Sequence, residues 1–369
     1  MERAKSGHRR KMNTTLDLSE LNQMIGQLFM VGISGPEVDR GTDTLIRDYN
    51  IGGVILFSRN VEDPVQVARL CKDLRDRAMS RHGIPLFLAV DQEGGRVARL
   101  RDPFTVFPGN RAIGMDEHSE RRAVEFGRVT AREMKMVGLN MDLAPVVDVQ
   151  KGEPERHLGD RLFGDDPERV GRLGRLVVRA LQKNGVMAVA KHFPGLGRAD
   201  LDPHFKLPRI DISMGEIDAN NLPPFRAAIE EGVSAIMSSH ALYPALDPEH
   251  PATLSRAVLT RLLREEMGHR GMIITDDLEM GAIAEGWGVA EGALAALEAG
   301  ADILLICKDQ DKVLESLDLI RGSVLRGDIP FQQVRTSNRR IIQAKKDFLL
   351  GRRRISLGRV REYFGNVGR

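Results

Sequence analysis

Two cations and an Asp-x-His pair are the residues of this chain best suited to chemistry. Lys191 and His192 directly follow the apolar run 186–190, and Asp202 and His204 lie farther along a stretch rich in glycine and proline. Charges are costly to desolvate, so a lysine and a histidine at the exit of a buried strand are expected to face a ligand. A carboxylate that binds one imidazole nitrogen orients the ring, and such a pair can serve as general acid and base. The alternative is a salt-bridged strand end with a surface loop.

A second candidate is the carboxylate pair that follows the apolar run 272–274. Asp276 and Asp277 are adjacent there, and because side chains alternate along a strand, only one of them is expected to face a given pocket. An aspartate in this position can attack the anomeric carbon of a sugar and form a covalent intermediate. It must be ionised, which a nearby Lys191 or Arg161 would favour. A metal ligand or a helix N-cap would leave the same sequence pattern.

Two arginine-bearing segments could hold a polar substrate. In the segment 91–99, Asp91 and Arg99 flank a Gly-Gly pair, and the segment 161–167 begins with Arg161. Carboxylates accept hydrogen bonds from hydroxyl groups and guanidinium groups donate to carbonyls or carboxylates, which suits a sugar. The GxGxxG pattern of a dinucleotide site is absent from the Gly-Gly segment.

The pattern of apolar runs predicts the scaffold. Eight short apolar runs alternate with helical segments: 27–33, 53–57, 85–90, 141–147, 186–190, 235–237, 272–274 and 301–307. Helices are expected over 65–80, 168–183, 256–267, 289–299 and 331–349. Such alternation predicts a parallel sheet, and eight units predict a closed (β/α)8 TIM-type barrel. The candidate residues follow the carboxyl ends of the strands, where this fold carries its active sites.

Composition bounds the remaining properties. The chain has 369 residues and a formal net charge of +2, which favours neither a nucleic-acid nor a membrane partner. No secretory signal is apparent in the first 15 residues, and the two cysteines fit free thiols in the cytoplasm. We expect a single catalytic domain over 16–350, between a disordered basic N-terminus (1–15) and a basic C-terminal tail (351–369). No exposed apolar stripe stands out, so a monomer is expected.

In combination, four segments resemble glycoside hydrolase family 3, in its bacterial β-N-acetylhexosaminidase branch. They are DQEGGRVARL (91–100), RLFGDDP (161–167), KHFPGLGRADLDPH (191–204) and GMIITDDLEM (271–280). The resemblance implies a (β/α)8 barrel that removes non-reducing terminal β-linked N-acetylglucosamine with retention of configuration. It also implies a peptidoglycan-derived muropeptide as the substrate, in the cytoplasm, with no cofactor and no metal.

The resemblance also implies roles for individual residues. Asp276 matches the nucleophile, and His204, oriented by Asp202, matches the general acid/base. The residues expected to bind the terminal sugar are Asp91, Arg99, Arg161, Lys191, His192 and His240. Three residues depart from the family pattern, namely Leu196, Pro203 and Glu279. Proline at 203 fixes φ and is expected to stiffen the Asp–His step.

Two other functions are compatible with part of this pattern. A non-catalytic sugar-binding barrel would keep Asp91 and Lys191 but would not need Asp276 or His204. A metal-dependent barrel hydrolase would use histidines with set spacing, often on the first strand, and the run 27–33 carries none.

Overall fold

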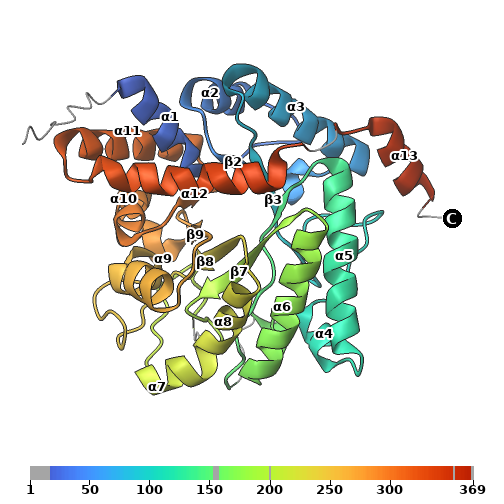
Figure 1. Cartoon of the computed structure of the whole chain (residues 1–369), viewed down its shortest axis with the longest axis vertical. Coiled ribbons are helices and arrows are strands. Elements are labelled where there is room, and N and C mark those ends of the chain that lie inside the picture. Colours follow the sequence, from blue (N-terminus) through green and yellow to red (C-terminus); the bar gives the residue numbers. More distant parts are fainter. Residues whose placement is uncertain (1–16, 153–157, 199–200, 352–353, 367–369) are drawn as a thin grey trace, which may run out of the picture.

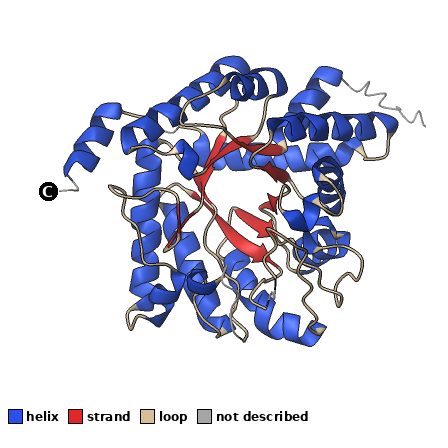
Figure 2. Cartoon of the chain, turned by 180° about the vertical axis from the view of Figure 1, so that it is seen from behind, coloured by secondary structure: helices blue, strands red, loops and turns tan. Residues whose placement is uncertain are grey.

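The protein is built around a closed barrel of eight parallel strands. The computed structural model describes residues 17–152, 158–198, 201–351 and 354–366, so the basic segment 1–15 lies outside the described residues. The barrel strands are β1 (Phe29–Gly32), β2 (Gly53–Leu56), β3 (Phe87–Val90), β6 (Met141–Asp142), β7 (Met187–Phe193), β8 (Ala235–Ser238), β9 (Met272–Asp277) and β10 (Ile303–Ile306). They follow one another in chain order, and β10 closes the barrel by pairing with β1. Figure 2 shows the strands as a ring inside the surrounding helices. The predicted (β/α)8 TIM-type fold is confirmed.

Helices surround the barrel. They are α1 (Leu18–Gln27), α2 (Arg40–Tyr49), α3 (Pro64–His82), α4 (Asn110–Met115), α5 (Ser119–Val137), α6 (Pro167–Lys183), α7 (Met214–Glu216), α8 (Leu222–Glu230), α9 (Gly281–Ala284), α10 (Val289–Ala299), α11 (Gln310–Arg326), α12 (Phe331–Leu349) and α13 (Leu357–Asn366). Five shorter or irregular helices are η1 (Ser58–Asn60), η2 (Gly159–Arg161), η3 (Ile217–Asn221), η4 (Ala252–Leu254) and η5 (Ala257–Glu266). The two Asp-Pro signals act as predicted, because Asp63 and Asp166 accept backbone hydrogen bonds at the starts of α3 and α6. The segment predicted as a helix over 256–267 is π-helical in η5.

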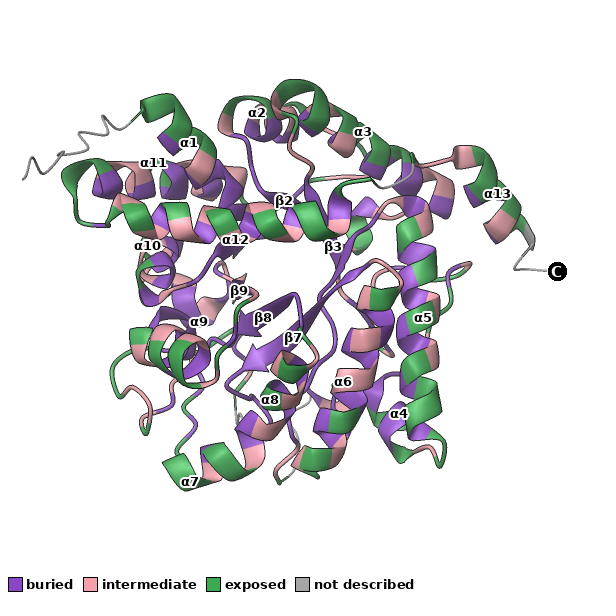
Figure 3. Ribbon diagram, viewed as in Figure 1, coloured by how far each residue is buried: buried purple, intermediate pink, exposed green. Residues whose placement is uncertain are grey.

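Burial explains why the strands read as continuous apolar runs. The barrel strands are covered on both faces, by their own interior packing and by the outer helices, whose exposed faces point to solvent (Figure 3). Buried apolar side chains from strands and helices form one core. Within the described residues no helix combines the length and the apolar character needed to cross a bilayer.

Helix α12 lies across the N-terminal end of the barrel, beside the starts of β1 and β2 (Figure 1). Lys345, on this helix, is only 2% exposed and donates from Nζ to Gln27 Oε1 at 2.6 Å and to the Gly52 carbonyl at 2.8 Å. Gln27 and Gly52 precede β1 and β2, so the helix packs beneath the strand starts. The opposite end of the barrel carries the polar residues singled out by the sequence.

Two expectations about element limits need correction. The strand expected over 186–190 continues to Phe193, because Phe193 pairs with Ser238 of β8 beyond a register shift, so Lys191 and His192 lie within β7. The segment 351–369, expected to be a solvated basic tail, contains α13. Val360 and Phe364 on that helix are buried, and α13 packs against α3 and α5 at the edge of the molecule (Figure 1).

Candidate active site

The predicted site residues converge on one cavity at the carboxyl ends of the barrel strands. The cavity has a volume of about 630 Å³, and its walls include eight of the nine predicted residues: Asp91, Arg99, Arg161, Lys191, His192, Asp202, His204 and Asp276. Two other cavities of similar size lie at the starts of the strands and contain none of these residues. The candidate cavity differs from these two by its place at the carboxyl ends of the strands, where this fold carries its active sites.

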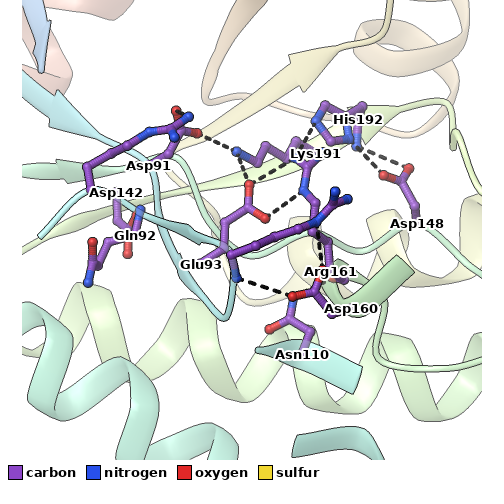
Figure 4. Close-up of polar contacts among 12 residues, drawn as sticks. Asp91, Gln92, Glu93, Asn110, Asp142, Asp148, Asp160, Arg161, Lys191 and His192 are labelled. Carbon is purple, nitrogen blue, oxygen red and sulfur yellow. Dashed lines mark hydrogen bonds and ion pairs between the residues drawn. The ribbon is translucent and has the colours of Figure 1, made fainter. Parts of the chain in front are cut away.

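A buried ion network forms the floor of this cavity (Figure 4). Lys191 Nζ lies 2.7 Å from Asp91 Oδ1 and 2.6 Å from Glu93 Oε1. Arg161 clamps Glu93 through two hydrogen bonds, from Nε at 2.8 Å and from Nη2 at 2.9 Å. Glu93 is 1% exposed, and although burial raises its pKa, Arg161 and Lys191 together hold that pKa well below its usual value. The pKa of Lys191 is raised in turn, because Asp91 and Glu93 outweigh the effect of its burial.

This network turns Asp91 toward the cavity as a charged acceptor. Asp91 binds Lys191 through Oδ1, and its Oδ2 lies 3.6 Å from Arg99 Nη2. Arg99 packs over the ring of Phe57, at 5.7 Å from the ring centroid. A carboxylate held between two cations in this way can accept hydrogen bonds from substrate hydroxyl groups without moving.

His192 is fixed by a second buried carboxylate. Its Nδ1 lies 2.7 Å from Asp148 Oδ2, while Asp148 Oδ1 accepts from the backbone N–H groups of His192 and Leu196 at 3.2 and 2.7 Å. On the other side of the ring, Nε2 lies 3.3 Å from Arg161 Nη2. Leu196 therefore contributes its backbone to the site, and its apolar side chain forms part of the cavity wall.

Asp276 is the carboxylate at the end of β9. Burial acts to raise its pKa, but His192, His240 and a backbone N–H, together with Lys191, outweigh that effect and lower the pKa. The prediction that a lysine would favour the ionised form fits this environment. Arg161, which was expected to act in the same way, is instead bound to Glu93. An ionised, partly exposed carboxylate in a cavity can act as a nucleophile.

Asp277 has a different environment from its neighbour. Its Oδ1 accepts from the Glu279 N–H at 3.1 Å, so it caps the following turn as predicted. Burial raises the pKa of Asp277 to about 7, and the charges of Glu279 and Asp276 act in the same direction. Both residues contribute atoms to the cavity wall, whereas strict alternation along the strand predicts that only one side chain faces it. The register between β9 and β10 shifts beside Leu305, the partner of Asp277, and such an irregularity breaks strict alternation.

His240 is the one predicted residue that does not line the cavity. It is fully buried, with Nδ1 2.8 Å from Thr253 Oγ1 and Nε2 2.9 Å from the carbonyl oxygen of Asp277. Burial lowers the pKa of His240 despite the nearby charge of Asp276. Both ring nitrogens are thus engaged by protein atoms, and the structure places this residue as a support for the end of β9.

The Asp202–His204 pair lies on a loop at the cavity mouth. His204 Nδ1 is 2.7 Å from Asp202 Oδ1, and the same oxygen accepts from the His204 backbone N–H at 3.0 Å. The side chain of His204 is 59% exposed, so the ring is accessible to a ligand. Asp202 and His204 are therefore in contact, and both line the same cavity as Asp276.

Sequence reasoning assigned no role to two buried carboxylates in this site. Glu93 follows Asp91 by two residues, which places both on one face of an extended segment, and this spacing was an available signal. Asp148 follows the apolar run 141–147 as other candidates follow theirs, but its partner His192 is 44 residues away in the chain, so the sequence did not indicate their contact. Among the residues that the structure describes, no group of three or more His, Cys, Asp or Glu side chains is arranged to hold a metal ion.

Comparison with known proteins supplies an independent observation. The family model described as the glycosyl hydrolase family 3 N-terminal domain matches residues 20–344. A β-hexosaminidase of Thiobacillus denitrificans is 39% identical over 298 residues, which cover 79% of this chain and 81% of that protein. A family 3 β-N-acetylglucosaminidase from Paenibacillus superposes with a TM-score of 0.87 at 37% identity, over 94% of this chain and 68% of that one. For a β-N-acetylhexosaminidase of Beutenbergia cavernae the TM-score is 0.82 at 30% identity, over 88% and 98% of the two chains.

Proposed function

Because this chain belongs to glycosyl hydrolase family 3 and is a hydrolase of the β-N-acetylhexosaminidase type, we propose that it works through a covalent intermediate on Asp276 with His204 as general acid/base. One observation carries the proposal. Asp276, whose pKa is lowered, and the Asp202–His204 pair lie on the walls of the same cavity. No other pair of side chains is invoked for the chemistry.

The two steps follow from these positions. First, an oxygen of Asp276 bonds to C1 of the terminal sugar while the bond from C1 to the leaving oxygen breaks, and His204 gives that oxygen a proton. Then water attacks C1, the sugar–Asp276 bond breaks, and His204 takes a proton from the water. Each step inverts C1, so the configuration is retained. Asp202 keeps the imidazole oriented throughout.

The floor of the cavity would hold the terminal N-acetylglucosamine. Asp91 and Lys191 offer an acceptor and a donor to adjacent hydroxyl groups, and Arg161 and His192 form the neighbouring wall. The buried partners Glu93 and Asp148 hold these groups in place before the substrate arrives. Such preorganisation lowers the barrier because the polar groups need not reorient during the reaction.

A muropeptide with an anionic aglycone is the substrate that best fits the mouth of the cavity. Arg96 and Arg99 both line it, and Arg96 is largely exposed although it pairs with Asp160 at 2.8 Å. A carboxylate on the aglycone, as in anhydro-N-acetylmuramic acid or its peptide, would complement these guanidinium groups. We include a cytoplasmic location and a monomeric state in the same proposal.

The catalytic assignment is tested with two variants and two kinds of substrate. Asp276→Ala is expected to abolish the release of a phenol from an aryl β-N-acetylglucosaminide. His204→Ala is expected to reduce kcat/KM, which reports formation of the intermediate, by roughly 10²- to 10⁴-fold on a disaccharide, whose leaving group needs a proton, and much less on a dinitrophenyl glycoside. Equal losses on both substrates would refute His204 as the acid, and an active Asp276→Ala variant would refute the nucleophile. A wild type that binds N-acetylglucosamine without hydrolysing either substrate would indicate a sugar-binding barrel instead.

The aglycone is tested separately, with purified anhydro-muropeptide and chitobiose as competing substrates. We expect the higher kcat/KM on the muropeptide, and a loss of that preference in Arg96→Ala. A higher kcat/KM on chitobiose would refute the muropeptide while leaving the catalytic assignment intact.

A further inference from the structure

The segment after the nucleophile contacts the loop that carries His204. Two backbone hydrogen bonds join them, from the Gly281 N–H to the His204 carbonyl at 3.1 Å and from the Ala282 N–H to the Pro203 carbonyl at 3.2 Å. Both donors lie at the start of α9, five and six residues after Asp276. The strand that ends in the nucleophile is therefore linked through backbone atoms to the loop that bears the acid/base.

The first of these contacts requires a glycine. A Cβ atom on Gly281 would lie 2.6 Å from the carbonyl oxygen of Phe205, 2.9 Å from its carbonyl carbon and 3.1 Å from the carbonyl oxygen of His204. All three are backbone atoms of the loop, so no side-chain rotation can relieve the contact. Gly281 does not have a positive φ, and the requirement is for space rather than for an unusual backbone conformation.

The same segment is anchored on its other side. The Glu279 carboxylate accepts from three successive backbone N–H groups, at 2.9 Å from Cys307, 2.6 Å from Lys308 and 3.1 Å from Asp309. Leu278 donates to the Leu305 carbonyl at 2.9 Å, which continues the attachment to β10. These bonds hold the start of α9 firmly against the barrel, so that it can serve as a fixed support for the loop. They also give a role to Glu279, a residue that departs from the family pattern.

We propose that Gly281 is a positioning residue that sets the location of His204 relative to Asp276, by allowing the acid/base loop to rest on the start of α9. This rests on the proposed roles of His204 and Asp276. An added methyl group at 281 pushes the backbone at 204–205 away from its support and moves the imidazole from the leaving oxygen. Displacements of about 1 Å cost on the order of 10²-fold in rate when a reacting group is misplaced.

The test compares two glycine-to-alanine changes in the same stretch. Gly281→Ala is expected to lower kcat/KM on chitobiose by roughly 10- to 100-fold, because protonation of the poor leaving group fails. On a dinitrophenyl glycoside, which needs no proton for formation of the intermediate, kcat/KM should change less than about twofold. Gly286→Ala is the matched control, since a Cβ there meets no atom within 4 Å, and both rates should equal those of the wild type.

A double variant separates positioning from a general effect on the fold. If Gly281 acts through His204, adding Gly281→Ala to His204→Ala should cause no further loss on chitobiose. Full additivity, equal losses on the two substrates, or wild-type rates in Gly281→Ala would each refute the proposal. If Gly281→Ala does not fold, Glu279→Gln replaces it, since it weakens the anchor without touching the loop. The same leaving-group pattern in weaker form would support the proposal, and wild-type rates would refute it.

The outcome can be distinguished from a failure of the catalytic assignment. A wild type with no hydrolase activity, or a His204→Ala variant that loses activity equally on both substrates, would refute the proposed function itself. A His204→Ala variant with the expected dependence on leaving group, beside a Gly281→Ala variant that behaves as the wild type, would refute only the role of Gly281.

Discussion

Carboxylates in and beside one cavity have different charge states because each has different neighbours. Glu93 has two cations in contact, and its pKa is held low although it is buried. Asp276 faces imidazoles and Lys191, which also lower its pKa. Asp277, one residue later, forms no ion pair with any cation among the described residues. Burial raises its pKa to about 7, and the charges of Glu279 and Asp276 act in the same direction. Neighbouring groups with divergent pKa values are a recurrent feature of enzyme active sites.

The raised pKa of Asp277 makes a prediction about stability and pH. Between the ordinary value of 3.8 and about 7, the folded protein binds this proton more tightly than the unfolded chain does. Stability is therefore lost as the pH rises through this window and the loss levels off above it. Asp277→Asn, which stays neutral, should gain stability over the wild type across the same window, reaching roughly 2–4 kcal/mol at pH 8.

Urea unfolding of both proteins from pH 4 to pH 9 measures this difference in the free energy of unfolding. Asp247→Asn is a useful control because the pKa of Asp247 is lowered, so this variant should lose stability relative to the wild type as the pH rises. A stability difference between Asp277→Asn and the wild type that did not vary with pH would show that Asp277 is not protonated in the folded protein at neutral pH.

At the scale of elements, apolar runs predict where strands lie better than where they end. Each of the eight runs overlaps a barrel strand, because strands buried on both faces are mostly apolar, but β7, β8 and β9 continue past the ends of their runs. The limit of β7 follows instead from pairing with β8, which carries polar residues into the strand. The supporting roles of Asp148 and His240 could not be predicted for a related reason, since they depend on partners brought close by the pairing of β6 with β7 and of β8 with β9. The motif residues that line the cavity were predictable because each closes a strand or follows it.

At the same scale, the proline in the acid/base loop is expected to limit which aglycones the enzyme accepts. Pro203 is buried, its carbonyl accepts from Ala282, and its ring fixes φ between Asp202 and His204. Pro203→Ser should make the backbone between Asp202 and His204 more flexible. Replacing a proline typically changes the conformational-entropy contribution to stability by about 0.4–1 kcal/mol. We expect kcat/KM on bulky aglycones to rise by about threefold, and activity on small ones to be retained. Initial rates on a series of aglycones measure this, and the same ratio of rates to the wild type across the series would contradict it.

At the scale of the whole molecule, the chain continues after α12 into a further helix, α13, which packs on the outside of the barrel helices. Beyond α12, α13 packs on α3 and α5 at the periphery of the molecule (Figure 1). Its Phe364 ring contacts the Phe104 ring with a centroid distance of 4.6 Å, and Tyr363 Oη donates to Glu133 Oε1 at 3.2 Å. This helix was not predicted from the sequence, because a short segment rich in arginine is also typical of a solvated tail.

The contribution of α13 to stability is measurable with one residue. Phe364 is 7% exposed, and Phe364→Ala leaves a cavity against Phe104, so we expect the free energy of unfolding to fall by roughly 3 kcal/mol. Glu362→Ala, an exposed position on the same helix, should change it by less than about 0.5 kcal/mol. Because none of the described residues of α13 lines the cavity, kcat of the folded Phe364→Ala variant should equal that of the wild type. Equal stabilities of the two variants in urea would mean that α13 is not docked in solution, as expected for a solvated tail.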